Sequence, residues 1–405
     1  MASGVNVCWW VTRGDGPTER SLGQVLLIEA VSGNELTLAA PLHHTFEAQY
    51  SPELLAVSRP GGPIHYVGIE DLYLSGGYGS NILVNLALYS WVKNVESDVV
   101  SGTHIVVTGS HRCVVRDSFV HRARDYNEGG NAYGISLDGQ TSDSLVENNS
   151  LAHLNIPLVM EVTGGGNVYG YNYVDSALQD SNLDWATSDI RTHCTYPHME
   201  LVEGNWIASA SPEDVHGTSG WLTFFRNYMT GVHENMVHPV DGHVFTPTSN
   251  VVAMNIFGGK QLYMNMVGNV LWRQGVPGDY EGCNNAAYKL SVVTCSPYVP
   301  DPDVAATAYR HGSFDYVTNS VIWDPTNGDH DLPDSLYLDS KPAFFGDRPW
   351  LFVDPEGDPK VRSLPAKDRF DQQGQPVVLS VSDVTITEGD SGNATATFTV
   401  TLSPE

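Results

Sequence analysis

The sequence predicts an all-β protein built as a parallel β-helix, a solenoid of short strands stacked in coils. Three observations lead to this fold class. Gly occurs 39 times in 405 residues and charged residues make up only 17%, which suits strands and turns better than long helices. No segment with helical periodicity exceeds about ten residues. A short apolar motif that contains an Asn or Asp recurs along most of the chain.

The recurring motif is an apolar residue, two further positions, an Asn or Asp, and then more apolar residues. The separations between successive Asn or Asp positions are 23, 32, 23, 33, 22, 42 and 50 residues, so the minimum is nearly constant. A coil of about 22 residues fits three short strands and three turns, with extra residues looped out at one corner. Because Asn tolerates the left-handed conformation and its amide bonds to an Asn above and below, we expect these residues to stack at one corner. They are Asn94, Asp117, Asn149, Asn172, Asn205, Asn227, Asn269 and Asn319.

With its Asn corner, its coil length and its excursions at one turn, the segment from 60 to 325 resembles the pectate-lyase-like β-helix superfamily. That superfamily includes polysaccharide lyases, glycoside hydrolases, epimerases and surface proteins. The resemblance implies a right-handed parallel β-helix. It implies no single chemistry, because this fold hosts many.

Further segments flank the expected β-helix of residues 61–325. Residues 1–60 should form an N-terminal β cap, in which 23–31 and 35–38 make a hairpin over the first coil. Residues 326–353 should close the other end, since an uncovered coil is an open sheet edge. The polar stretch 354–378 is interpreted as a linker. Residues 379–405 resemble the opening of a Calx-beta domain, an extracellular calcium-binding β-sandwich, but are too short to complete one.

The charge balance limits the classes of partner. A net charge of −27, from 47 acidic and 20 basic residues, argues against nucleic acid, which needs clustered Lys and Arg. Calcium is a candidate cofactor because carboxylates suit hard cations, although the acid excess would also serve solubility alone. No stretch approaches 18 apolar residues, so we expect no membrane span.

The cysteines and the N-terminal residues indicate the compartment. The five cysteines include no CxxC pair, which argues against structural zinc. Cys283 and Cys295 flank a short loop, and they are expected to be either a disulfide or two buried thiols. The first residues lack the features of a signal peptide. We expect a secreted or cell-surface protein whose signal peptide is not part of this sequence.

Counting back from the Asn positions turns sequence spacing into spatial adjacency. Asp138 lies 11 residues before Asn149, and Glu161 lies 11 before Asn172. We therefore expect the two on neighbouring coils, about 5 Å apart at Cα. The alternation of side chains points Ile135 inward and both carboxylates outward. Such a pair is unfavourable unless it is protonated, bridged by a cation or used in a reaction.

Three interpretations of this carboxylate pair stay open. An acid and a nucleophile at that spacing would favour a retaining glycosidase. As the resemblance implies for lyases, Asp138 and Glu161 would alternatively hold a calcium ion that clamps a uronate. The remaining interpretation is a solvated pair without a role.

Other candidates lie near the variable loops. His121 and His153 each follow an Asn or Asp of the motif by four positions and are candidate general acids or bases, or else a structural pair. Asp125 and Asp214 are expected to assist catalysis. Charged and aromatic loop residues suit sugar rings and their hydroxyl rims. The expected substrate-binding residues are Arg124, Glu128, Trp185, Arg191, Tyr196 and His216.

These features predict an extracellular carbohydrate-active enzyme that cleaves a polysaccharide in a groove on the β-helix. A glycoside hydrolase is slightly favoured over a calcium-assisted polysaccharide lyase, because carboxylates dominate the proposed face and a lyase needs a cation beside the uronate. The rival hypothesis is a non-catalytic surface protein that binds glycan or calcium.

Overall fold

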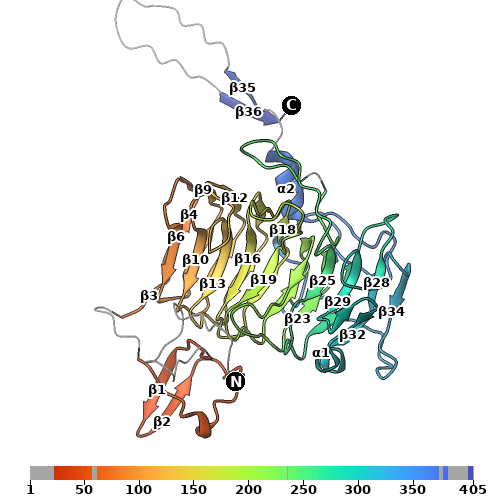
Figure 1. Ribbon diagram of the computed structural model, residues 1–405. Helices are drawn as coiled ribbons and strands as arrows, with labels where there is room; N and C mark the ends of the chain where they lie inside the picture. Colours follow the sequence, from red (N-terminus) through yellow and green to blue (C-terminus); the bar gives the residue numbers. More distant parts are fainter. Residues whose placement is uncertain (1–21, 57–61, 235, 374–376, 382–399, 405) are drawn as a thin grey trace, which may run out of the picture.

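The computed structural model describes residues 22–56, 62–234, 236–373, 377–381 and 400–404, and it confirms a parallel β-helix (Figure 1). Three long sheets run along the rod, and each coil adds one strand to sheet 1, then to sheet 2, then to sheet 3. Sheet 1 contains β6 (Ser80–Asn85), β10 (Thr103–Thr108), β13 (Tyr133–Asp138), β16 (Ile156–Glu161), β19 (Ile190–His193), β22 (Ala210–Ser211), β25 (Val252–Ile256), β29 (Ala286–Leu290) and β28 (Asp279–Glu281).

The other two long sheets are built from shorter strands. Sheet 2 contains β4 (Gly68–Glu70), β8 (Trp91–Lys93), β11 (Val114–Arg116), β14 (Leu145–Glu147), β17 (Val168–Gly170), β20 (Leu201–Glu203), β23 (Thr223–Phe225), β26 (Asn265–Val267) and β32 (Tyr309–His311). Sheet 3 contains β5 (Tyr73–Ser75), β9 (Glu96–Val100), β12 (Phe119–Ala123), β15 (Ser150–Ala152), β18 (Tyr173–Val174), β21 (Trp206–Ile207), β24 (Tyr228–Met229), β27 (Val270–Leu271), β33 (Ser313–Asp315) and β34 (Ser320–Ile322).

The core fills the interior of the coils. Successive side chains of a strand point to opposite faces, and Ile135, Leu137 and Leu158 of sheet 1 are buried in the main core as predicted. Asp138 and Glu161, which end two of these strands, are partly exposed. Packing of the apolar positions therefore sets the face on which the carboxylates lie.

Five of the eight predicted corner residues form a continuous ladder between sheets 2 and 3. The backbone N of Asn149 and its Nδ2 both donate to Oδ1 of Asn172, each at 3.0 Å. The same pair of bonds joins each member to the next. The buried ladder is Asn149, Asn172, Asn205, Asn227 and Asn269.

The other three predicted corner residues lie outside this ladder, and for them the prediction was wrong. Arg116 pairs with Glu147 across β11 and β14, so two positions later Ser118 lies opposite Asn149. Ser118 therefore extends the ladder by one coil, and its N donates to Oδ1 of Asn149 at 3.0 Å. Asp117 and Asn94 are therefore displaced by one position. At the far end, the Ser313 hydroxyl accepts from the N of Asn269 at 3.1 Å, in the place expected for Asn319.

The N-terminal segment forms the predicted hairpin from β1 (Ile28–Ser32) and β2 (Glu35–Leu38). It does not lie over the first coil. The N of Val25 donates to the carbonyl of Gln140 at 3.1 Å, and Nε2 of His43 lies 2.8 Å from Oδ1 of Asp143. These contacts place the segment along the corner between sheets 1 and 2.

The C-terminal segment runs back along the coils and does not simply close the last one. Nε of Arg226 donates to the carbonyl of Pro333 at 2.9 Å, and the Tyr337 hydroxyl donates to Glu147, three coils earlier, at 2.8 Å. The region expected to be a linker contains α2 (Pro365–Gln373), which packs beside sheet 3 (Figure 1). At the last coil, β34 pairs antiparallel with β33, and Val304 of α1 (Pro302–Thr307) enters the main core.

Smaller elements complete the described chain. They are the pairs β3 (Ile64–His65) with β7 (Ala87–Leu88), β30 (Thr294–Cys295) with β31 (Tyr298–Val299), and β35 (Val377–Val381) with β36 (Val400–Pro404), and the 3-10 turns η1 (Ala48–Tyr50) and η2 (Ala343–Phe345). Residues 382–399, the middle of the segment that resembles a Calx-beta opening, lie outside the described residues.

The cysteines are found in two states. Cys283 and Cys295 form a disulfide, the first of the two alternatives, with their Cα atoms 5.8 Å apart, whereas Cys113 is a free, buried thiol. None of the helices in the described part of the chain has the length and apolar character that crossing a bilayer requires.

Candidate active site

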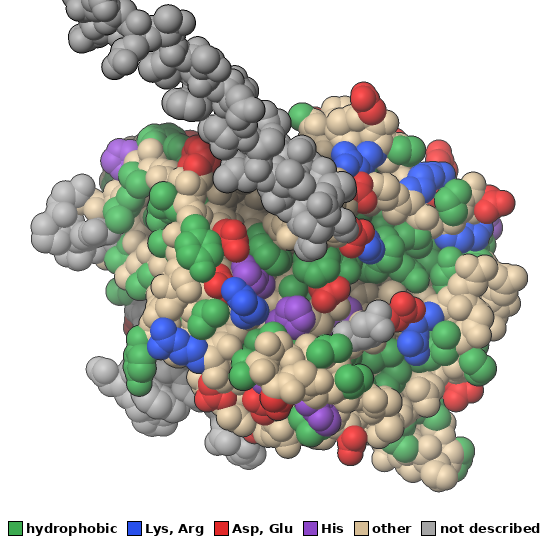
Figure 2. Space-filling view, turned by 90° about the horizontal axis from the view of Figure 1, so that it is seen from above, with side chains coloured by type: hydrophobic (Ala, Val, Ile, Leu, Met, Phe, Trp, Pro, Cys, Tyr) green, Lys and Arg blue, Asp and Glu red, His purple; other side chains and the backbone are tan. Residues whose placement is uncertain are grey.

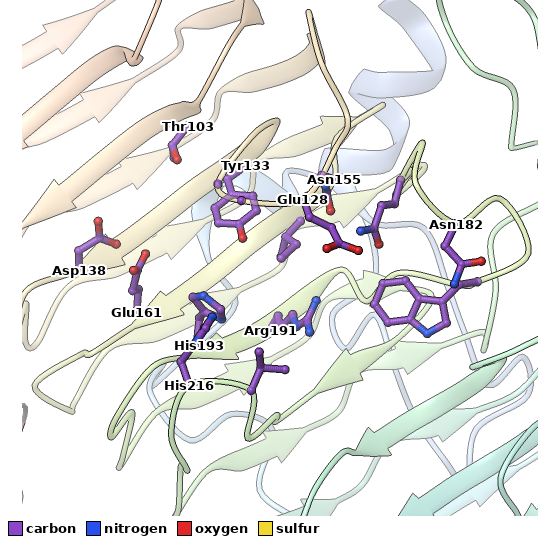
Figure 3. Close-up of a pocket in the computed structure, with 16 residues that line it drawn as sticks. Thr103, Glu128, Tyr133, Asp138, Asn155, Glu161, Asn182, Arg191, His193 and His216 are labelled. Carbon is purple, nitrogen blue, oxygen red and sulfur yellow. The ribbon is translucent and has the colours of Figure 1, made fainter. Parts of the chain in front are cut away.

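A cavity of about 980 Å³ lies over the outer face of sheet 1 (Figure 3). Strands β13, β16 and β19 form its floor, loops from the corner between sheets 3 and 1 form one wall, and the loop after β22 forms another. The lining residues are Thr103, Glu128, Gly129, Gly130, Tyr133, Asp138, Asn155, Ile156, Glu161, Gln179, Asn182, Trp185, Arg191, His193, Val215 and His216.

Two carboxyl groups lie side by side on the floor. The strand register pairs Asp138 of β13 with Glu161 of β16, and Glu161 with His193 of β19. Figure 3 shows both carboxyl groups directed to the same side of the sheet. The predicted adjacency of Asp138 and Glu161 is therefore confirmed, and His193 extends the row.

The environment of Asp138 favours its protonated form. Burial and the neighbouring charge of Glu161 raise the pKa of Asp138 well above its ordinary value. The Ser136 hydroxyl, which donates to Oδ1 of Asp138, opposes this increase without cancelling it. Asp138 is thus suited to carry a proton, because partial burial and a nearby negative charge favour the neutral acid.

A buried ion-pair network lies next to these carboxyls. Nη2 of Arg191 donates to Oε2 of Glu213 at 2.8 Å, and Nδ1 of His193 lies 2.6 Å from Oε1 of Glu213. Burial alone would raise the pKa of Glu213, but the hydrogen bond from His193 and the charge of Arg191 lower it. Glu213 therefore acts as an ionised anchor that orients His193 and neutralises Arg191.

Uncharged groups complete the cavity. Burial raises the pKa of Tyr133 to about 12, so its phenol stays neutral and can donate or accept a hydrogen bond. The amides of Asn155, Gln179 and Asn182 and the indole of Trp185 line the walls. A mixture of amides and an aromatic ring suits the hydroxyl rim and apolar face of a sugar.

Comparison of the chain with protein-family models, with curated proteins and with solved structures finds no match.

The structure brings six of the predicted site residues into this cavity. With Asp138 and Glu161 lie Glu128, Trp185, Arg191 and His216. The guanidinium of Arg191 lies 5.7 Å from the centre of the Trp185 ring, and the rings of His193 and His216 meet edge to face at 4.9 Å. Loop residues chosen for their chemistry thus meet the floor carboxylates.

Two predicted histidines lie on a different sheet. His121 belongs to β12 of sheet 3, where its Nε2 lies 3.0 Å from Glu96 and its Nδ1 3.5 Å from Asp98. His153 was expected beside His121, but the register pairs His121 with Ala152. The slip arises because Ser118, and not Asp117, follows the Asn ladder.

Four further predicted residues do not line the cavity. Asp125 accepts from the N of Asn127 at 2.9 Å within its own loop. Nη2 of Arg124 donates to the carbonyl of Gly76 at 2.9 Å. Tyr196 stacks on His198, with ring centres 5.8 Å apart. The carboxylate of Asp214 lies against the backbone of Gly258.

Sequence reasoning missed His193, Glu213 and Tyr133 as members of the site. His193 precedes Asn205 by 12 residues, and not by the 11 that relate Asp138 and Glu161 to the ladder. Counting back 11 residues from each ladder Asn therefore does not identify His193. Continuing the outward-facing positions along β19 would have pointed to both Arg191 and His193.

The fit of calcium to this site depends on its oxygen donors. Calcium takes six to eight oxygen ligands, typically including carboxylates. Asp138 and Glu161 offer two carboxyl groups, and among the residues that the structure describes no group of three or more His, Cys, Asp or Glu side chains is placed to hold a metal. These side chains do not supply a full calcium shell by themselves.

Proposed function

We propose that this protein is an extracellular glycoside hydrolase that cleaves a polysaccharide in the cavity on sheet 1. The observation that carries the proposal is the pair of adjacent floor carboxyls, of which Asp138 has a raised pKa. A carboxyl with a raised pKa beside a second carboxyl is typical of acid and base pairs in catalysis. The resemblance to the pectate-lyase-like superfamily supports a polysaccharide substrate, and the Cys283–Cys295 disulfide supports an oxidising compartment.

In the proposed reaction, Asp138 donates its proton to the glycosidic oxygen as the bond from that oxygen to the anomeric carbon breaks. The Glu161 carboxylate attacks the same carbon and forms a glycosyl ester. Water then attacks this ester, Asp138 takes the proton of the water, and Glu161 is released. One water is consumed and both groups return to their starting states. The backbones of neighbouring strands are about 4.8 Å apart, and retaining enzymes hold their two carboxyl groups about 5 to 5.5 Å apart, so carboxyls on adjacent strands suit this mechanism.

Hydrolysis is favoured over elimination by the composition of the floor. A lyase removes a proton next to a uronate carboxylate and needs a cation to neutralise that group. Calcium held by Asp138 and Glu161 would provide it in this alternative. The carboxyls would then be ligands, and the raised pKa of Asp138 would have no role in proton donation.

Product analysis on a panel of polysaccharides tests the proposal. We expect new reducing ends without an unsaturated product. Asp138→Asn and Glu161→Gln should each lower the rate by about 100-fold or more, because each removes a group that acts in the transition state. The exposed residues Asp303 and Glu356 provide matched controls, Asp303→Asn and Glu356→Gln, which should keep full activity.

The same experiment separates the alternatives. An ultraviolet-absorbing unsaturated uronate among the products would identify a lyase. Glycan binding without any cleavage would identify a non-catalytic surface protein, to which the Calx-beta resemblance of the C-terminal segment would then add weight. Full activity in Asp138→Asn would show that the catalytic carboxyls lie elsewhere.

A further inference from the structure

The cavity holds little unmatched positive charge. Arg191 is the only Lys or Arg among the described residues that line it, and Glu213 already lies 2.8 Å from its guanidinium. Glu213 is 2% exposed and is held ionised by His193 and Arg191. The positive charge of Arg191 is therefore already neutralised by the buried carboxylate of Glu213.

The remaining acidic groups of the cavity face an incoming ligand. Glu128 stands on a wall, and Asp138 and Glu161 lie on the floor (Figure 3). A ligand carboxylate entering here would lose water without gaining an unmatched cation, and it would approach the carboxylates of Glu128 and Glu161, whereas the protonated Asp138 adds no repulsion. Both effects are strongly unfavourable in a partly enclosed site.

The polar atoms of the cavity that have no hydrogen-bond partner among the described residues include the acceptor Oε1 of Gln179 and the donor Nε of Arg191. The Gln179 side chain is only 6% exposed. Nε2 of Gln179 donates to the Ser181 hydroxyl at 3.0 Å, which holds the amide in place. Unpartnered buried groups favour a ligand that satisfies them.

The chemistry of these two atoms distinguishes between ligands. A sugar hydroxyl donates and accepts, so neighbouring hydroxyls can satisfy both Gln179 and Arg191. A carboxylate only accepts, and it leaves Oε1 of Gln179 without a donor. The Trp185 ring on the same wall offers an apolar surface to a sugar.

We propose that the cavity selects an uncharged, hydroxyl-rich glycan and rejects the uronate glycan of the same linkage and configuration. This inference depends on the proposed function of the site and names its substrate class. It also excludes the polyuronates that a calcium-assisted lyase would use.

Matched oligosaccharides isolate the charge from every other feature. Suitable pairs differ only at C6, such as β-1,4-glucan with β-1,4-glucuronan and β-1,4-mannan with β-1,4-mannuronan, together with α-linked pairs. Binding is measured calorimetrically to Asp138→Asn, which resembles the protonated acid and prevents cleavage. Salt of about 0.5 M shortens the Debye length to about 4 Å, so repulsion from the whole acidic molecule is screened while contacts inside the cavity persist.

We expect at least one neutral oligosaccharide to bind about tenfold more tightly than its uronate partner. Equal or tighter binding of the uronate would overturn the proposed selection against charge, but it would still support a glycan-binding site. Binding of no oligosaccharide in any pair would overturn the glycan assignment itself.

Removing the negative charge of Glu213 provides a second measurement. Glu213→Gln leaves the guanidinium of Arg191 unmatched, so uronate affinity relative to the neutral partner should rise about tenfold. Adding Arg191→Gln to that variant should restore the original ratio, and Glu356→Gln should not change it. An unchanged ratio in a folded Glu213→Gln protein would contradict the proposal, and the unmodified ratio remains decisive if that variant fails to fold.

Discussion

Asp138 and Glu161 have the same functional group but different surroundings. Burial comes first among the causes that raise the pKa of Asp138, and the charge of Glu161 comes second. The raised pKa of Asp138 is therefore a property of its position on the floor and not of its chemistry. The proposed hydrolysis requires such a raised pKa of its proton donor.

A titration of Asp138 tests this account at the residue scale. Since the charge of Glu161 raises the pKa of Asp138, Glu161→Gln should lower that pKa, although burial should keep it above the ordinary value. Carbon-13 NMR of the Asp138 carboxyl measures the shift, with Glu356→Gln as control. In the proposed hydrolase, activity should fall as the pH rises through the pKa of Asp138. If the pKa of Asp138 were the same in Glu161→Gln as in the unmodified protein, the coupling between the two residues would be refuted.

The Asn ladder shows how one element maintains the register of many coils. Asn172 is buried, accepts two bonds from Asn149 and donates to Asn205 and to the carbonyl of Val146. Each corner amide thus connects the coils on both sides. Because the strands are only two or three residues long at β17 and β18, such corner bonds make a large contribution to their alignment.

The ladder predicts unequal costs for two chemically identical substitutions. Asn172→Ala would leave buried polar groups of Asn149 and Val146 without partners, and it should lower the free energy of unfolding by about 3 kcal/mol. The exposed side chain of Asn94 donates to Oδ1 of Asp71 at 2.7 Å, and its φ of +49° would strain an alanine, so Asn94→Ala should cost about 1 kcal/mol. Urea unfolding of both variants measures the difference. Equal losses would show that the ladder does not hold the coils in register.

At the scale of the whole molecule, the C-terminal segment returns along the solenoid and ties distant coils together. Glu203 is buried, and its Oε2 accepts from the N of Leu336 at 2.9 Å while Oε1 accepts from the Ser335 hydroxyl. Burial raises the pKa of Glu203 to about 7 despite these bonds. The segment is therefore attached through a group that titrates near neutral pH.

The raised pKa of Glu203 makes stability depend on pH. The ordinary pKa of a Glu side chain is 4.5, against about 7 for Glu203 in the folded protein. Protonation of Glu203 therefore stabilises the folded state over the unfolded state fully below pH 4.5, and this stabilisation is lost as the pH rises from 4.5 to about 7. The loss would reach about 3 kcal/mol. In Glu203→Gln, the difference in urea stability between pH 4.5 and pH 8 should shrink, whereas in Glu356→Gln it should not. An unchanged difference in Glu203→Gln would contradict this linkage.

The face seen from above in Figure 2 shows basic side chains in small groups beside acidic ones. On sheet 3, Nη2 of Arg122 lies 2.7 Å from Oδ2 of Asp98. Several of the described basic residues are paired with a nearby carboxylate in this way, as Arg191 is in the cavity. This pattern accords with the scarcity of Lys and Arg in the composition.

The sequence alone determined the fold class and the core of the site. A repeat of nearly constant minimum length specifies stacked coils, and the alternation within a strand specifies which side chains point outward. Asp138 and Glu161 have the same offset from Asn149 and Asn172. Their adjacency on β13 and β16 therefore followed from local pattern.

Only the tertiary structure decided which other groups join them. Register between coils depends on backbone hydrogen bonds across inserts of unequal length, and one extra residue moves a side chain to the other face or to another row. That is why Ser118 replaced Asp117 in the ladder and why His193 was missed. The returning C-terminal segment follows no repeat at all, because contacts such as Tyr337 with Glu147 join positions 190 residues apart.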